Sequence, residues 1–139
     1  MTRGILGVLL TLAVSVPAFP APEAKAKRPR LDLKVTPRMG FAPLNVLLLA
    51  ELVGGDEVEE YYCPQLEWDW DDGGKSATES DCAPFEPGMK IERRFTTEHE
   101  YRRSGAYNIK VTLRRAGRNL VVQTLRLDVK PGIQELQRP

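Results

Sequence analysis

The stretch GAYNIKVTLRR, residues 105–115, decides the fold of this chain. Apolar and polar side chains alternate along it: Tyr107, Ile109, Val111 and Leu113 against Asn108, Lys110, Thr112 and Arg114. Successive side chains of a β-strand point to opposite faces of the sheet, so a period of two predicts a half-buried strand. The next residues, 116–119 (AGRN), are typical of a turn, which predicts that the chain reverses there.

The same period recurs on both sides of this stretch. Apolar residues alternate with polar ones at 31–35, 66–70 and 125–129. Part of the run 44–50 is apolar on both faces of its predicted strand, and at 91–95 Ile91 and Phe95 flank Arg93 on one face. No part of residues 31–130 has a sustained helical period. Several short strands separated by turn residues predict an all-β domain, an antiparallel β-sandwich.

The N-terminal residues 1–18 have the pattern of a secretory signal peptide. Arg3 is followed by the uncharged, Leu- and Val-rich residues 4–16, and Ala18 suits a cleavage site. As an uncleaved anchor this apolar run would rise only ~20 Å as a helix, short of the ~30 Å hydrocarbon core. We therefore expect cleavage, no membrane insertion afterwards, and a secreted or periplasmic protein.

The rest of the chain divides by composition into three parts. Residues 19–30 (FPAPEAKAKRPR) combine proline, alanine and basic residues without apolar periodicity, which predicts a flexible linker. Residues 31–130 contain all the strand patterns and form the predicted domain. Residues 131–139 are predicted to be a disordered tail.

Charge and composition exclude several function classes. The 20 Lys and Arg nearly balance the 19 Asp and Glu in 139 residues, so nothing draws the chain as a whole to nucleic acid. Acidic residues concentrate at 51–86 and basic ones at 87–130. We interpret this as two complementary parts of one fold; the alternative is an acidic surface that attracts cations or basic partners. One His and two Cys leave little material for a catalytic site, so we expect no enzyme activity and no cofactor.

Three motifs occur in a familiar order along the domain. They are P-x-x-G-x-A-P-L-x-V at 37–46, L-x-W-x-W-x-D-G at 66–73, and H-x-Y-x-x-x-G-x-Y-x-I-x-V-x-L at 99–113. Together they resemble the polycystic-kidney-disease (PKD) domain. The resemblance implies an immunoglobulin-like β-sandwich of about seven strands. It also implies an extracellular spacer, or a module that contacts proteins or carbohydrates, without catalysis.

The motif residues are expected to be structural: Trp68, Trp70, Asp72, Gly73, His99, Tyr101, Gly105 and Tyr107. Period two places both tryptophans on one face, where they can fill the core. The family usually has glycine where this sequence has Asp71, and aspartate tolerates the left-handed region that such a turn uses. The resemblance implies a hydrogen-bonded His99 at a strand entrance. A catalytic His99 with the nearby Ser104 lacks an orienting acid.

Cys63 and Cys82 are the only cysteines. An even count in a chain that is predicted to be exported favours a disulfide over two free thiols. This bond is not a feature of most PKD domains, and it would bracket the strand that holds the two tryptophans.

Three hypotheses for function follow, all for a protein expected to be monomeric. In the first, the domain binds a protein or polysaccharide through Tyr61, Tyr62 and Phe85 beside the disulfide, although these rings could simply pack against the sandwich edge. In the second, it binds calcium through carboxylates around one turn: Asp69, Asp71, Asp72 and Asp81. In the third, it is a purely structural spacer.

Overall fold

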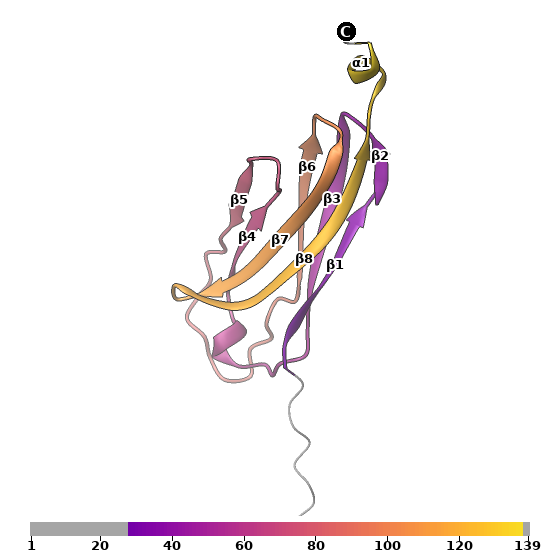
Figure 1. Ribbon diagram of the computed structural model, residues 1–139. Coiled ribbons are helices and arrows are strands. Elements are labelled where there is room, and N and C mark those ends of the chain that lie inside the picture. Colours follow the sequence, from indigo (N-terminus) through magenta and orange to yellow (C-terminus); the bar gives the residue numbers. More distant parts are fainter. Residues whose placement is uncertain (1–27, 138–139) are drawn as a thin grey trace, which may run out of the picture.

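The computed structural model describes residues 28–137, which form two β-sheets packed face to face (Figure 1). The smaller sheet has the order β1 (Arg30–Thr36), β3 (Leu44–Val53), β6 (Arg94–Tyr101). The larger sheet has the order β2 (Met39–Phe41), β8 (Arg118–Lys130), β7 (Gly105–Arg115), β4 (Gln65–Asp69), β5 (Lys75–Thr78). A short 3-10 helix, η1 (Glu59–Tyr61), precedes β4, and one helical turn, α1 (Ile133–Leu136), follows β8. The predicted signal peptide and most of the predicted linker lie outside the described residues.

The strand pairing confirms the predicted sandwich. Neighbouring strands are antiparallel except for β2, which runs parallel to β8. The described residues contain eight strands rather than about seven. Sequence periodicity did not indicate β2 and β5, because β2 has only three residues and all four residues of β5 are exposed.

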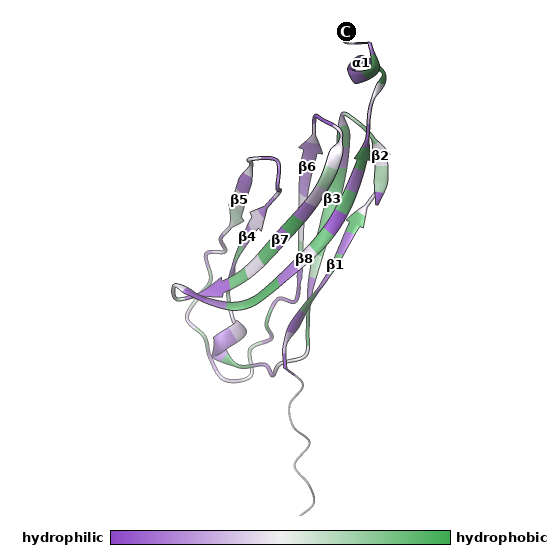
Figure 2. Ribbon diagram, in the orientation of Figure 1, coloured by the Kyte–Doolittle hydropathy of each residue, from purple (hydrophilic) through white to green (hydrophobic). Residues whose placement is uncertain are grey.

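The core lies between the sheets and is built from alternate residues of the strands (Figure 2). In the stretch that predicted the fold, Ile109, Val111 and Leu113 are completely buried, whereas Tyr107 near its start is half-buried. Trp68 and Trp70 are also buried, and their stacked rings lie 6.1 Å apart. The centre of the sandwich is therefore filled with apolar side chains.

Ion pairs join the acidic segment to the basic one. Five ion pairs connect residues 51–86 with residues 87–130: Glu51–Arg94, Glu57–Arg93, Glu59–Arg115, Glu60–Arg118 and Glu67–Arg114. A hydrogen bond between Asp72 and His99 joins the same two segments. These contacts confirm that the two segments are complementary parts of one fold.

The described part of the predicted disordered tail differs from the prediction. Residues 133–136 form α1, and the carboxylate of Glu135 accepts a hydrogen bond from the backbone N–H of Ser104. Gly132 makes this path feasible, because a Cβ there would lie 1.9 Å from the carbonyl oxygen of Ala42. The sequence did not predict this because α1 is held by one side-chain hydrogen bond and by the close packing of Gly132 on the Ala42 backbone. Neither contact requires a periodic pattern of apolar residues.

Within residues 28–137 there is no helix with the length and apolar character needed to cross a membrane.

Candidate functional site

Two clusters of polar and aromatic side chains lie in the loops at opposite ends of the sandwich, one around Tyr62 and Phe85 and one around His99. The disulfide end comprises η1, the β7–β8 turn and the segment 79–93. The histidine end comprises the β4–β5 turn at 70–74, the β6–β7 loop at 102–104, and α1. The described chain enters at the disulfide end and finishes at the histidine end.

Cys63 and Cys82 form the predicted disulfide. Their Cα atoms are 6.1 Å apart, and the bond ties the residues just before β4 to the segment that follows β5. Cys63 has φ +51°, an uncommon conformation for a residue with a side chain. The bond therefore continues the β4–β5 pairing, whose register ends at Leu66 and Thr78, toward the disulfide end.

Tyr62 and Phe85 meet beside this disulfide. Their ring centroids are 5.3 Å apart at an interplanar angle of 58°, and the hydroxyl of Tyr62 donates a hydrogen bond to the carbonyl of Ala83 at 2.9 Å. The guanidinium of Arg115, from the end of β7, lies 5.8 Å from the centre of the Tyr62 ring. The three side chains line a shallow depression together with both cysteines, and we call them the aromatic surface.

Tyr61 is not part of this surface. Its ring lies over Gly55, where a Cβ would come within 3.0 Å of it, and Pro29 also contacts that glycine position. Burial, followed by the nearby charge of Glu60, raises the pKa of the Tyr61 hydroxyl. The structure thus separates Tyr61, which packs over Gly55, from Tyr62 and Phe85.

The aromatic surface includes one residue that the sequence did not indicate. Arg115 was one basic residue among many, and its contact with Tyr62 depends on the β7–β8 turn lying beside η1. Glu59 pairs with Arg115 at 3.7 Å and keeps it in place. Only the pairing of β7 with β4 brings Arg115 close to Tyr62. Its register places Arg114 opposite Gln65, so the next residue of β7 lies beside the segment that precedes β4.

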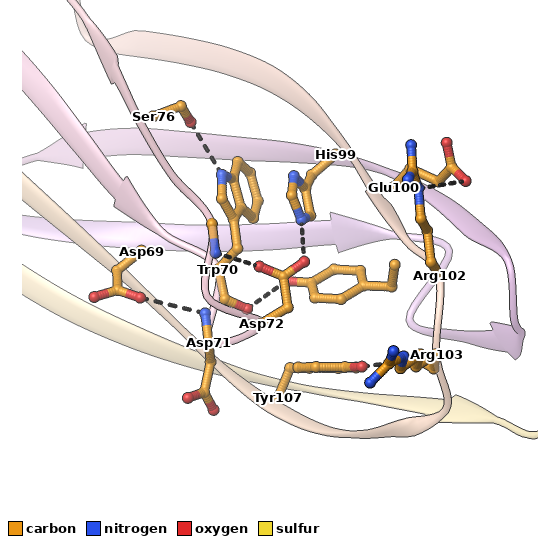
Figure 3. Close-up of polar contacts among 12 residues, drawn as sticks. Asp69, Trp70, Asp71, Asp72, Ser76, His99, Glu100, Arg102, Arg103 and Tyr107 are labelled. Atoms are coloured by element: carbon orange, nitrogen blue, oxygen red, sulfur yellow. Dashed lines mark hydrogen bonds and ion pairs between the residues drawn. The ribbon is translucent and has the colours of Figure 1, made fainter.

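At the histidine end, His99 is part of an aromatic stack (Figure 3). Its ring is parallel to that of Trp70, at a centroid distance of 4.3 Å, and its Nε2 is 2.7 Å from Oδ2 of Asp72. The ring of Tyr101 meets His99 edge-on at 4.9 Å, and the Tyr101 hydroxyl donates to the carbonyl of Trp70 at 3.0 Å. Burial raises the pKa of Tyr101, so this hydroxyl remains a donor. His99 therefore links β6 to the β4–β5 turn.

The β4–β5 turn is held by aspartates in the way that the sequence suggested. Asp71 adopts φ +60° and Gly73 φ +91°, so aspartate does occupy the left-handed region here. Oδ1 of Asp72 accepts the N–H of Gly74 at 2.8 Å. Burial alone would raise the pKa of Asp72, but the hydrogen bonds from His99 and Gly74 outweigh it and leave the pKa lowered. This carboxylate is committed to internal contacts.

The structure does not bring the four predicted calcium ligands together. Asp69 pairs with Lys75 at 3.2 Å, and Asp71 accepts the backbone N–H of Asn108 at 2.8 Å. Asp81 lies at the other end of the molecule, in the depression beside the disulfide. Among residues 28–137, no group of three or more His, Cys, Asp or Glu is placed to hold a metal ion.

Gly105 and Tyr107 shape the loop that leads into β7. The Tyr107 ring lies 4.3 Å from that of Tyr101, and its hydroxyl donates to the carbonyl of Arg103 at 2.8 Å (Figure 3). A Cβ at Gly105 would come within 3.3 Å of the Tyr107 ring, which explains a glycine there. Tyr107 thereby holds the 102–104 loop against the sandwich.

Two sheets with these strand orders, closed by the parallel β2–β8 pair, define an immunoglobulin-like β-sandwich. Among solved structures, the chain is similar to the PKD domain of an M14-like peptidase from Thermoplasmatales archaeon SCGC AB-540-F20. The TM-score is 0.50 at 14% identity, over 76% of this chain and 98% of that domain. This likeness confirms the PKD-like fold that the motifs suggested. No protein-family model and no curated protein sequence matches the chain.

Proposed function

We propose that this protein is an exported, non-catalytic interaction module that binds a partner protein through the aromatic surface of Tyr62, Phe85 and Arg115. Export is supported by the signal-like residues 1–18 and by the disulfide, since such bonds persist in oxidising compartments. A non-catalytic role is supported by the PKD-like fold and by His99, whose ring is stacked and whose Nε2 is bonded to Asp72.

The observation that carries the proposal is a rigid aromatic pair that is only half covered. Tyr62 and Phe85 are both half-buried, although the disulfide, the Tyr62 hydrogen bond and their mutual contact fix them in place. Tyrosine and arginine are enriched among the residues that dominate binding energy at protein interfaces. A pre-positioned ring also loses little conformational freedom when a partner binds.

The geometry favours a protein over a polysaccharide. Sugars stack on an open aromatic face, but the guanidinium of Arg115 lies over the Tyr62 ring, and Phe85 is tilted by 58° against it. Asp81 and Glu59 line the same depression, and Asp81 forms no ion pair within the described residues. We therefore expect a partner that inserts an apolar side chain and surrounds it with basic ones.

The test uses the chain from residue 19, with its disulfide formed, as bait for envelope and secreted fractions. The variant Y62A/F85A removes both rings, and F41A is the matched control because Phe41 is an exposed aromatic residue on β2, away from this surface. We expect one partner to be captured by the unmodified chain and by F41A but not by Y62A/F85A. Calorimetry with the purified partner should then show at least a tenfold loss of affinity, about 1.4 kcal/mol.

A second variant keeps the experiment decisive if Y62A/F85A does not fold. R115Q removes the cation over Tyr62 while both rings remain, and tryptophan fluorescence reports whether Trp68 and Trp70 stay buried. Equal capture by folded Y62A/F85A would refute the aromatic surface as the binding site. If the unmodified chain is retained on an immobilised polysaccharide and Y62A/F85A is not, the ligand of the aromatic surface is a glycan and not a protein.

A spacer is the second candidate, and one observation favours it. The described chain enters and leaves the sandwich at opposite ends, so the domain can separate whatever is attached to its termini (Figure 1). No capture with any variant would favour this role. Export is tested separately by the intact mass of the natural protein, which should begin at Phe19 and lack two hydrogens at the cysteines.

A further inference from the structure

The β6–β7 loop at the histidine end holds a carboxylate from the same chain. The backbone N–H of Ser104 points at Glu135, whose two carboxylate oxygens lie 2.9 and 3.2 Å from the nitrogen. Glu135 belongs to α1, which buries none of its residues: Ile133 and Leu136 are 74% and 73% exposed. The helix is therefore held by this hydrogen bond and the backbone contact at Gly132, without apolar packing.

The same loop is positively charged. Arg102 is 85% exposed and lies 3.7 Å from Glu100, whereas Arg103 has no carboxylate within 4.0 Å among residues 28–137. Both arginines line a depression with His99 and Tyr107, on the side of the loop shown in Figure 3. The other acidic group there, Asp72, is already paired with His99. Arg103 is thus available to an incoming anion.

We propose that the loop 102–104 is a binding site for a glutamate or aspartate side chain of a partner polypeptide, and that Glu135 of α1 occupies this site in the free protein. The Ser104 N–H supplies the hydrogen bond, and Arg103 supplies positive charge. A carboxylate is the group already seated there. The helix that carries it can leave without exposing any buried side chain.

The electrostatics of Glu135 support this assignment. The pKa of its carboxyl is lowered, first by the Ser104 N–H and also by the charge of Arg103. The loop thus favours an ionised carboxylate. This surface lies at the opposite end from Tyr62 and Phe85, so it goes beyond the proposed function and can be tested independently.

The experiment follows the Ser104 amide by NMR in the full chain from residue 19. The probe is a capped synthetic peptide with the sequence of residues 131–139, PGIQELQRP, and its comparison peptide has glutamine in place of the glutamate. If α1 occupies the site about nine-tenths of the time, E135Q should bind the glutamate peptide about tenfold more tightly than the unmodified chain. E92Q is the matched control, because Glu92 is exposed and forms no hydrogen bond or ion pair in the described structure.

The outcomes separate the proposal from its rivals. Tighter binding in E135Q, unchanged binding in E92Q and at least fivefold weaker binding when R103Q is added would support it. The proposal would be overturned if both peptides, or acetate alone, changed the chemical shift of the Ser104 amide equally. A concentration-dependent dimer of the unmodified chain, with Ser104 bound to Glu135 of a second copy, would also overturn it. R103Q removes the charge of Arg103 but keeps the backbone amide of Ser104. Weaker binding by a folded E135Q/R103Q variant therefore reports the loss of this charge and not an unfolded 102–104 loop.

Discussion

Removal of the Cys63–Cys82 bond should cost a large part of the stability of the domain. The variant C63A/C82A opens a loop of about 20 residues, because the cysteines are 19 positions apart. The chain-entropy relation assigns such a loop about 3 kcal/mol, since the bond restricts the unfolded chain. For a domain of this size, 3 kcal/mol corresponds to a melting temperature about 12 °C lower.

Local contacts in the folded protein should keep the loss near this value. Without the bond, the hydroxyl of Tyr62 still donates to Ala83, and the amide of Gln65 still donates to Glu79 at 2.7 Å. The native segment therefore remains in place, and the change falls on the unfolded state. Cys63 has φ +51°, which alanine would retain, so C63G/C82A should recover about 1 kcal/mol relative to C63A/C82A.

Urea unfolding followed by tryptophan fluorescence measures both effects, because Trp68 and Trp70 are buried in the core. The oxidised chain, the chain in a reducing agent and the two double variants are compared at one pH. A loss below about 1 kcal/mol in C63A/C82A would refute the entropic account. It would mean that the unfolded chain already keeps these segments together.

Three further predictions concern the histidine end. Y101F should lower the free energy of unfolding by about 1–3 kcal/mol, because it removes the buried hydrogen bond to the Trp70 carbonyl; a change under 0.5 kcal/mol in urea unfolding would contradict this. The lowered pKa of Asp72 predicts stability that is complete above the unfolded value of about 4 and is lost as the pH falls through the folded value. Melting curves should therefore fall below pH 4, and less steeply in D72N; parallel curves would count against the contribution of Asp72. A chelator should leave the melting temperature unchanged, since Asp69 and Asp71 are engaged by Lys75 and a backbone amide; a drop restored by calcium would reinstate a metal site.

Burial on one face is what made most strands predictable. Ile109, Val111 and Leu113 alternate with polar residues because β7 has one face in the core, and the sequence shows that period directly. The edge strand β5 pairs only with β4 and buries no residue, so it leaves no pattern. Its role is still specific, since Ser76 and Thr78 accept hydrogen bonds from the indole N–H groups of the two core tryptophans.

The contacts of the candidate sites were less accessible to sequence reasoning. The resemblance implied a hydrogen-bonded His99, but not that its partner is Asp72 or that its ring lies on Trp70. Tyr61 and Tyr62 are adjacent in sequence and yet have different neighbours, because Tyr61 ends η1 whereas Tyr62 has extended backbone. Such contacts depend on how loops from distant strands meet, and no local periodicity records that.

The fold itself explains why two surfaces can act separately. The 11 residues of β7 span about 36 Å as an extended strand, and the two candidate surfaces lie near its opposite ends. The apolar core separates them, so no residue of the aromatic surface lines the 102–104 loop. The disulfide fixes one surface covalently, whereas Glu135 fills the other through a hydrogen bond that a competitor can replace. The shape of the aromatic surface is therefore fixed, whereas in our proposal the 102–104 loop can exchange its own helix for another chain.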